Sequence, residues 1–175
     1  KLKSLQIRGM GVQSNFPREI GQLSNLQYLS LAETDFRFST IPESVFANMT
    51  KLRILDLTNC QLGGRIPRMV SALSMLRDLR MTGNFFDGVI PEGLYKLTKL
   101  SQLEVLKTPR LQPLSGHVSA LKWLRELRVE ASSSFDGSLP DEITALSALQ
   151  SLTWTGANGS GLIPTGISNL KRLRK

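Results

Sequence analysis

Leucines recur along the whole chain at a nearly constant spacing. They occupy positions 2, 26, 52, 76, 100, 124, 149 and 173, and successive steps measure 24, 26, 24, 24, 24, 25 and 24 residues. The residues three and five places after each of the first seven leucines are all apolar, although only 41% of the chain is hydrophobic. This period indicates an array of small units, each of which buries its apolar face against its neighbours.

Each unit is predicted to begin with a short strand. Side chains alternate in a strand, so the residues three and five places after the opening leucine point inward. Those at the second, fourth and sixth places point outward. Successive strands run in the same direction, and parallel strands need a crossover connection, which the rest of each unit supplies. We therefore predict a parallel sheet in which residues at the same place in successive units form a row.

The third unit carries the most specific motifs. Its first half matches the pattern L-x-x-L-x-L-x-x-N/C-x-L at Leu52, Leu55, Leu57, Cys60 and Leu62. Residues 62–67 then match L-x-G-x-I-P, and the fourth unit carries the same elements through Ile90-Pro91. With these motifs the chain resembles the plant-type leucine-rich repeat family over its whole length.

The resemblance implies an α/β-type solenoid of about seven turns of 24–26 residues. A parallel β-sheet would line its concave side, and short irregular or 3-10 segments would form its convex side. The L-x-G-x-I-P segments would contribute a second small sheet. The family is typical of the ectodomains of plant receptor-like kinases and receptor-like proteins, and of secreted inhibitors. Their concave strands bind peptides, hormones, glycans or a co-receptor, so the expected partner is a protein or peptide, with a glycan as a further possibility.

A single repeat array is predicted over residues 1–175, with units opening at 2, 26, 52, 76, 100, 124 and 149 and a partial unit at 173. The chain begins inside a unit and stops as an eighth opens. Solenoids normally end in capping units with a polar outer face. We therefore expect an internal fragment of a longer protein. The paired-cysteine caps typical of the family's ectodomains are missing from this segment.

Several turns depart from the repeat. The second has two extra residues around 36–40, the fifth lacks L-x-G-x-I-P across 106–115, and the sixth has one extra residue in 132–135. Irregular turns can extend a loop toward a ligand. They can equally be sequence drift without a function, and the sequence alone leaves both interpretations open.

The outward rows contain the candidate binding face. The fourth place after the opening leucine is occupied by alternating charges in four successive units, at Asp56, Arg80, Glu104 and Arg128, which we call the charge row. Adjacent strands would place opposite charges side by side. One interpretation is a row of charges that neutralise one another and keep the sheet soluble. The other is a surface that selects a charged ligand. The full candidate face comprises Arg8, Tyr28, Asp56, Asp78, Arg80, Glu104, Glu126, Arg128 and Glu130.

Aromatic residues and the single cysteine have simpler expectations. Tyr28 is predicted to project from the concave face, where tyrosine is a common binding anchor but also an ordinary exposed residue. Trp154 occupies an inward place and is expected in the core. Trp123 precedes an opening leucine at the rim, either as a contact residue or as a lid on the stack. Cys60 is the only cysteine, which excludes an internal disulfide, and is expected to be a buried structural thiol.

The charge is basic and concentrated at one edge of the predicted sheet. The formal net charge is +8, and four of the 22 basic residues lie within the last five positions. Many of the others flank the opening leucines, at Lys1, Lys3, Lys51, Arg53, Arg77, Lys99 and Arg125. This basic rim is either a solvated edge or a surface that attracts an acidic partner or polyanion. No nucleic-acid-binding motif accompanies it, so nucleic acid is not an expected partner.

Signatures of catalysis are missing from the sequence. His117 is the only histidine, and the chain has neither G-x-S-x-G nor G-x-x-x-x-G-K-[ST]. We therefore expect no catalytic, cofactor or metal site in this segment, and any enzymatic activity would belong to flanking domains.

Two sequons bear on the compartment. Asn48-Met49-Thr50 and Asn158-Gly159-Ser160 match N-x-[ST], although the repeat consensus itself tends to generate such a triplet. The first hypothesis is an extracellular or secreted receptor segment that binds its ligand on the concave face, with membrane attachment only through segments outside this chain. The alternative is an intracellular scaffold or structural subunit that contacts partners through its rim and convex side. The lone cysteine and the basic rim motivate this alternative.

Overall fold

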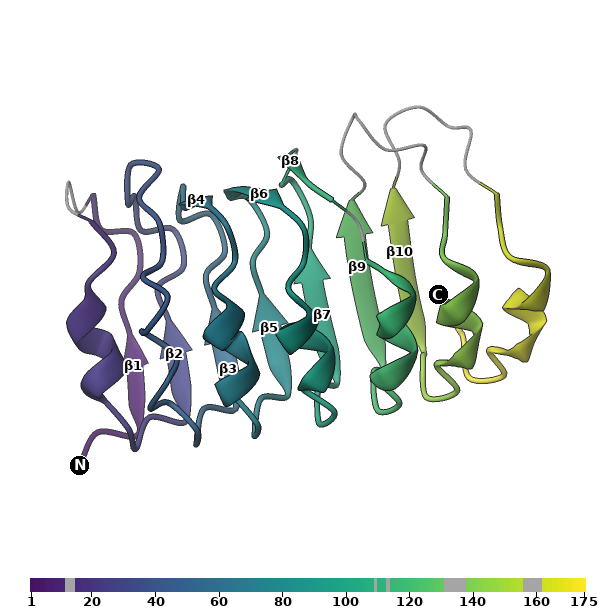
Figure 1. Cartoon of the computed structure of the whole chain (residues 1–175), viewed down its shortest axis with the longest axis horizontal. Coiled ribbons are helices and arrows are strands. Elements are labelled where there is room, and N and C mark those ends of the chain that lie inside the picture. Colours follow the sequence, from purple (N-terminus) through teal and green to yellow (C-terminus); the bar gives the residue numbers. More distant parts are fainter. Residues whose placement is uncertain (12–14, 109, 113, 131–137, 156–161) are drawn as a thin grey trace.

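A parallel sheet runs along the whole length of the molecule. The computed structural model describes residues 1–11, 15–108, 110–112, 114–130, 138–155 and 162–175. Within these ranges seven short strands follow one another in chain order across the sheet (Figure 1). They are β1 (Ser4–Gln6), β2 (Tyr28–Ser30), β3 (Ile54–Asp56), β5 (Asp78–Arg80), β7 (Gln102–Val105), β9 (Glu126–Glu130) and β10 (Ser151–Thr155). The predicted solenoid is confirmed.

The strands pair in the register that the repeat period predicts. Each residue lies beside the residue at the same place in the next unit, and the central row runs Leu29, Leu55, Leu79, Leu103 and Leu127. These five leucines are at most 1% exposed, as are the opening leucines of the second to seventh units. One continuous leucine core therefore lies between the sheet and the convex side.

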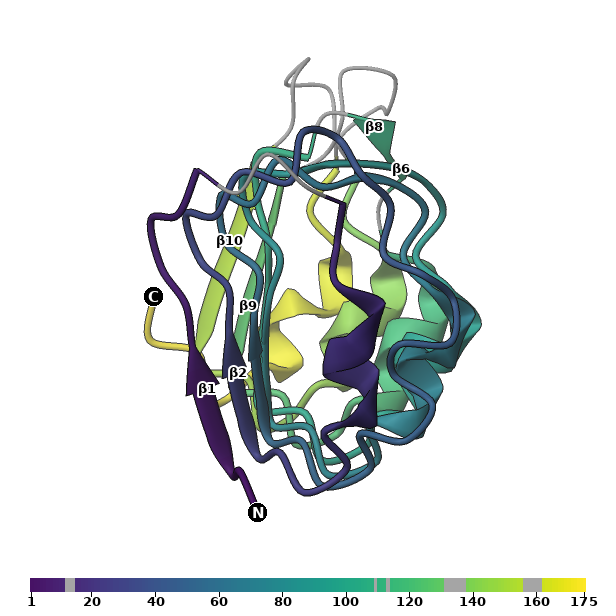
Figure 2. The same ribbon diagram turned by 90° about the vertical axis from the view of Figure 1, so that its left-hand side faces the viewer.

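Short 3-10 helices form the convex side, opposite the sheet (Figure 2). They are η1 (Arg18–Gln22), η2 (Arg68–Ala72), η3 (Glu92–Lys96), η4 (Gly116–Ala120), η5 (Asp141–Ala145) and η6 (Thr165–Asn169). All but η4 begin directly after a proline, whose fixed φ suits a helix start. In η2 and η3 the third residue, Val70 or Leu94, is buried in the leucine core. In the second unit, Pro42 is followed by turns in place of a helix.

A second, smaller sheet forms where the chain leaves the main sheet. It consists of β4 (Gly63–Gly64), β6 (Phe85–Gly88) and β8 (Arg110–Leu111), again parallel. The L-x-G-x-I-P glycines Gly64 and Gly88 have φ values of 68° and 73°, in the left-handed region that favours glycine. The small sheet implied by the resemblance is confirmed.

A buried polar row joins the turns to one another. It lies at the eighth place after the opening leucine, at Thr34, Cys60, Asn84 and Thr108, all of which are buried. The Asn84 amide nitrogen donates to the carbonyls of Leu57 (2.7 Å) and Met81 (2.9 Å), and its oxygen accepts from the Leu62 N–H at 3.0 Å. One side chain thus satisfies backbone groups of two successive units.

Candidate functional site

The charge row lies on one face of the sheet, as predicted. Asp56, Arg80, Glu104 and Arg128 occupy matching positions of β3, β5, β7 and β9. All four are only partly exposed. Their carboxylates and guanidinium groups therefore lie on adjacent strands of the central concave face.

The pairing of these charges differs from the prediction. The shortest contacts run along a strand: Arg80 lies 2.7 Å from Asp78, and Arg128 lies 2.7 Å from Glu126. Within the described residues, the one ion pair of this row that crosses between strands is Arg128–Glu104, at 4.0 Å. The two members of each pair lie two residues apart on one strand, so their side chains share a face of the sheet. The long arginine side chain therefore reaches its acidic neighbour. The arginines are neutralised, but not by a ladder that alternates from strand to strand.

Asp78 occupies an unfavourable environment for a carboxylate. Its side chain is 13% exposed. Burial raises the pKa of Asp78, the charges of Asp56 and Glu104 raise it further, and the ion pair with Arg80 partly opposes this shift. The centre of the concave face therefore holds excess negative charge, which Arg80 reduces.

An apolar and aromatic end adjoins this charged centre. Tyr28 on β2 pairs in register with Ile54 on β3, and both are partly exposed. Ile54 in turn lies beside Asp78 in the same row. The predicted outward position of Tyr28 agrees with this register, and the sheet offers apolar contact area directly next to carboxylates.

The remaining predicted residues lie at the margins of this face. Arg8 is exposed and forms an ion pair with Glu33 at 2.8 Å. Glu130, at the end of β9, accepts a hydrogen bond from the backbone N–H of Lys107 at 2.8 Å. The structure therefore brings together the central residues of the candidate set, whereas Arg8 and Glu130 are occupied by local contacts.

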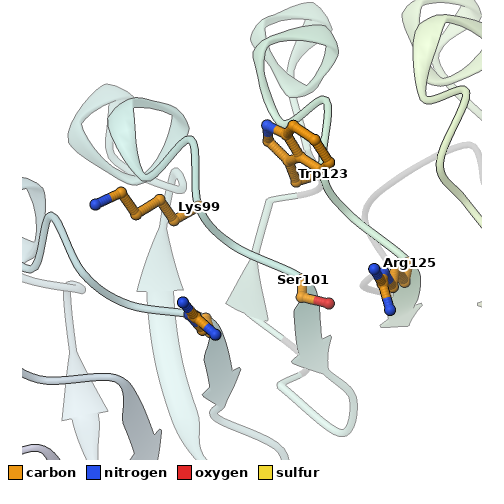
Figure 3. Close-up of a pocket in the computed structure, with 5 residues that line it drawn as sticks. Lys99, Ser101, Trp123 and Arg125 are labelled. Atoms are coloured by element: carbon orange, nitrogen blue, oxygen red, sulfur yellow. The ribbon is translucent and has the colours of Figure 1, made fainter.

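At the edge where the strands begin, the basic rim contains a pocket. Its volume is about 380 Å³, and it is lined by Arg77, Lys99, Ser101, Trp123 and Arg125 (Figure 3). Trp123 is 66% exposed, so it is not a lid on the stack. The repeat period placed the basic residues at this edge, but the pocket between them was not predicted.

The inward prediction for Cys60 is confirmed, and that for Trp154 is confirmed in its direction but not in full burial. Cys60 is fully buried, its thiol donates to the Leu31 carbonyl at 3.0 Å, and burial raises its pKa to about 12. A thiol with so high a pKa is almost entirely protonated at neutral pH and is a poor nucleophile. Trp154 is partly buried and packs against the leucine core.

Some sequence predictions concern accessibility or lie beyond the described residues. Asn48 is exposed, so its sequon is accessible. Asn158 and the irregular turn at 132–135 lie outside the described residues, as does part of 106–115.

The irregular turn of the second unit lies beside the small sheet. There Phe38 is 58% exposed, and the centre of its ring lies 4.7 Å from the centre of the Phe85 ring. The extra residues of the second unit therefore form an aromatic contact beside the small sheet. Within the described residues, no helix is long and apolar enough to cross a membrane.

Curated relatives of this chain carry two kinds of names. The chain is 28% identical to the Disease resistance protein RFL1 of Arabidopsis thaliana over 85% of its own length and 17% of the relative. It is 37% identical to Receptor-like protein 41 of the same plant over 40% of its length and 8% of the relative. The chain thus spans less than a fifth of the length of these relatives.

Solved structures share the fold. A leucine-rich repeat protein of Leptospira interrogans matches with a TM-score of 0.83 and 29% identity, over 99% of this chain and 42% of that one. The Arabidopsis receptor kinase HAESA, in complex with the peptide hormone IDA and the co-receptor SERK1, matches with a TM-score of 0.80 and 26% identity. That match covers 92% of this chain and 27% of HAESA. The family model described as "Leucine-rich repeat region" matches residues 1–110. The chain therefore belongs to the leucine-rich repeat family, and its relatives place it with the plant-type repeats.

Proposed function

We propose that this chain is a non-catalytic recognition segment of a plant-type receptor-like protein or receptor-like kinase, and that its concave sheet binds a peptide or protein. The observation that carries the proposal is the central concave face, where partly buried charges adjoin the apolar pair Tyr28 and Ile54. Apolar anchors beside oriented charges are typical of protein recognition surfaces. The complex of HAESA with a peptide hormone and a co-receptor supports the same kind of partner.

The charges of this face favour a cationic ligand. The face holds four carboxylates and only two guanidinium groups. The carboxylates belong to Asp56, Asp78, Glu104 and Glu126, and the guanidinium groups to Arg80 and Arg128. Both arginines already contact acidic neighbours. A ligand carboxylate would compete with these contacts, whereas a ligand cation would relieve the repulsion around Asp78. The proposed ligand is therefore a peptide with a basic residue next to an apolar one.

The test is a selection of peptides from a random-sequence display library on the immobilised protein. Selected peptides are synthesised, and their dissociation constants are measured by calorimetry on the wild type and on Tyr28→Ala/Asp56→Asn. Asparagine keeps an oxygen that can accept the Thr58 N–H, which now donates to Asp56 at 3.0 Å. Loss of one aromatic anchor and one charge should weaken binding about tenfold or more.

The control is Asp87→Asn on β6, which removes one carboxylate from the small sheet. Selected peptides should carry net positive charge and bind this control as they bind the wild type. Peptides that bind the concave variant with unchanged affinity would show that the recognition surface lies elsewhere.

The second candidate function is an intracellular scaffold, which two observations favour. The basic rim residues Arg77, Lys99 and Arg125 are exposed, and Cys60 is a free thiol, as cysteines of intracellular proteins usually are. We place the chain outside the cell in preference, because the sequon at Asn48 is exposed.

This choice of compartment predicts a glycan on Asn48. Protein purified from its native source should lose the mass of one N-linked glycan at Asn48 on enzymatic deglycosylation, as measured by intact and peptide mass spectrometry. The substitution Asn48→Gln should abolish this mass change, whereas Asn25→Gln, which lies outside a sequon, should not. An unmodified Asn48 in the native protein would favour the intracellular scaffold.

A further inference from the structure

The rim pocket differs from the concave face in its charge balance. Its lining includes Arg77, Lys99 and Arg125 and no acidic residue. All ion pairs found among the described residues involve other cations, namely Arg8, Arg18, Arg80 and Arg128. The three rim cations are exposed and carry charge that no neighbour within the described part of the chain neutralises.

Backbone hydrogen bonds hold the segments that carry these side chains side by side. The N–H of Arg125 donates to the carbonyl of Ser101, and the N–H of Ser101 donates to that of Arg77, both at 2.8 Å. Lys99 precedes Ser101 by two residues and Trp123 precedes Arg125 by two residues, on the segments that lead into β7 and β9 (Figure 3). The pocket is therefore built on three adjacent turns of the solenoid, which place the three cations along one edge of the sheet; the Lys99 ammonium group lies 2.9 Å from the Met75 sulfur and is free to exchange this weak contact for an anion.

The chemistry of the pocket suits an anion that carries an apolar neighbour. Guanidinium groups bind carboxylates through two parallel hydrogen bonds, and the ammonium group of Lys99 adds a third cation. The exposed indole of Trp123 offers a broad apolar face and one N–H donor. A segment that carries several carboxylates with apolar residues between them would use all of these groups.

We propose that the rim pocket is a docking site for an acidic segment of a partner protein, in which carboxylates alternate with apolar side chains. Charge complementarity is the basis for this choice. Around the pocket, the residues that precede the opening leucines alternate between basic and apolar, at Lys51, Met75, Lys99 and Trp123. A polyanionic glycan with a charge on every unit would leave the apolar members of this row uncovered. The site is separate from the concave face, whose excess charge is negative, and its partner is distinct from the proposed concave ligand.

The experiment uses a synthetic peptide with the sequence Glu-Leu-Glu-Phe repeated three times, titrated against the protein by calorimetry. The test variant is Arg77→Glu/Arg125→Glu. The matched control is Arg68→Glu/Lys96→Glu, which makes the same change in net charge at exposed positions of the convex helices η2 and η3. Loss and reversal of two exposed charges should weaken binding about tenfold in the test variant. Binding to the control should change less than twofold.

Three comparison ligands make the result specific. The peptide with glutamine in place of glutamate should bind at least tenfold more weakly, and so should a 12-residue polyglutamate that lacks apolar side chains. Polygalacturonate should not displace the acidic peptide at equal charge concentration. Equal binding to the rim variant, or equal binding of polyglutamate or polygalacturonate, would overturn the proposal. The concave variant Tyr28→Ala/Asp56→Asn should bind the acidic peptide normally, so this test and that of the concave function fail independently.

Discussion

The substitution Asn84→Ala is expected to lower the free energy of unfolding by about 3 kcal/mol, because it leaves buried backbone groups without partners. Asn84 is 1% exposed, and it serves the carbonyls of Leu57 and Met81 and the N–H of Leu62. Alanine cannot replace these hydrogen bonds, and water has no access to the site. Urea unfolding followed by circular dichroism measures the change.

The other members of the same row indicate how specific this effect is. Cys60 makes one short contact, to the Leu31 carbonyl. The hydroxyl groups of Thr34 and Thr108 are buried with no hydrogen-bond partner among the described residues. The row therefore contributes most to stability at Asn84, which joins the third and fourth units. Because neighbouring units stabilise one another, loss at this junction weakens the whole array.

The control for this prediction is Asn25→Ala. The Asn25 oxygen accepts a hydrogen bond from Lys51 at the exposed rim, at 2.8 Å, and water can replace that donor. We expect a change of about 0.5 kcal/mol or less there. A loss below about 1 kcal/mol for Asn84→Ala would show that the backbone groups find other partners.

The period of the leucines is sufficient to predict most of the fold. Residues such as Leu55 and Leu79 are apolar, evenly spaced and inward, so strand register follows directly from sequence. The left-handed turn after each of the first five strands of the main sheet is harder to detect. Gly9, Glu33, Asn59, Gly83 and Lys107, all at the seventh place, have φ between 53° and 72°. Only two of them are glycines, so residue type alone does not reveal the turn.

The candidate site was predictable in its composition but not in its pairing. The repeat placed Asp56, Arg80, Glu104 and Arg128 in one row. The choice of partner depends on how far each arginine side chain extends along its strand, and this brought Arg80 to Asp78. The rim pocket likewise depends on the orientation of Trp123, which no periodicity specifies.

The substitution Arg80→Gln is expected to destabilise the protein by about 1–2 kcal/mol at pH 7, because it removes the cation that faces a mostly buried carboxylate. Asp78 would then be ionised beside Asp56 and Glu104 without its ion pair. The measurement is the free energy of unfolding from urea titrations between pH 4 and pH 7.

The pH dependence follows from the raised pKa of Asp78. Burial raises this pKa in the folded state above the unfolded value of 3.8, so the folded protein binds more protons in that range. Stability therefore falls as pH rises from the unfolded pKa through the folded one. Without Arg80 the folded pKa is higher still. The destabilisation by Arg80→Gln should accordingly be largest at pH 7 and shrink toward pH 4, where Asp78 becomes protonated.

Two further variants separate this effect from a loss of packing. Arg53→Gln makes the same change at an exposed rim position, and it should alter stability by about 0.5 kcal/mol or less at every pH. The double variant Asp78→Asn/Arg80→Gln removes the titrating group, so most of the pH dependence of the Arg80→Gln effect should disappear. A destabilisation by Arg80→Gln that stays constant from pH 7 to pH 4 would show that Arg80 stabilises the sheet by packing its aliphatic chain and not by neutralising Asp78.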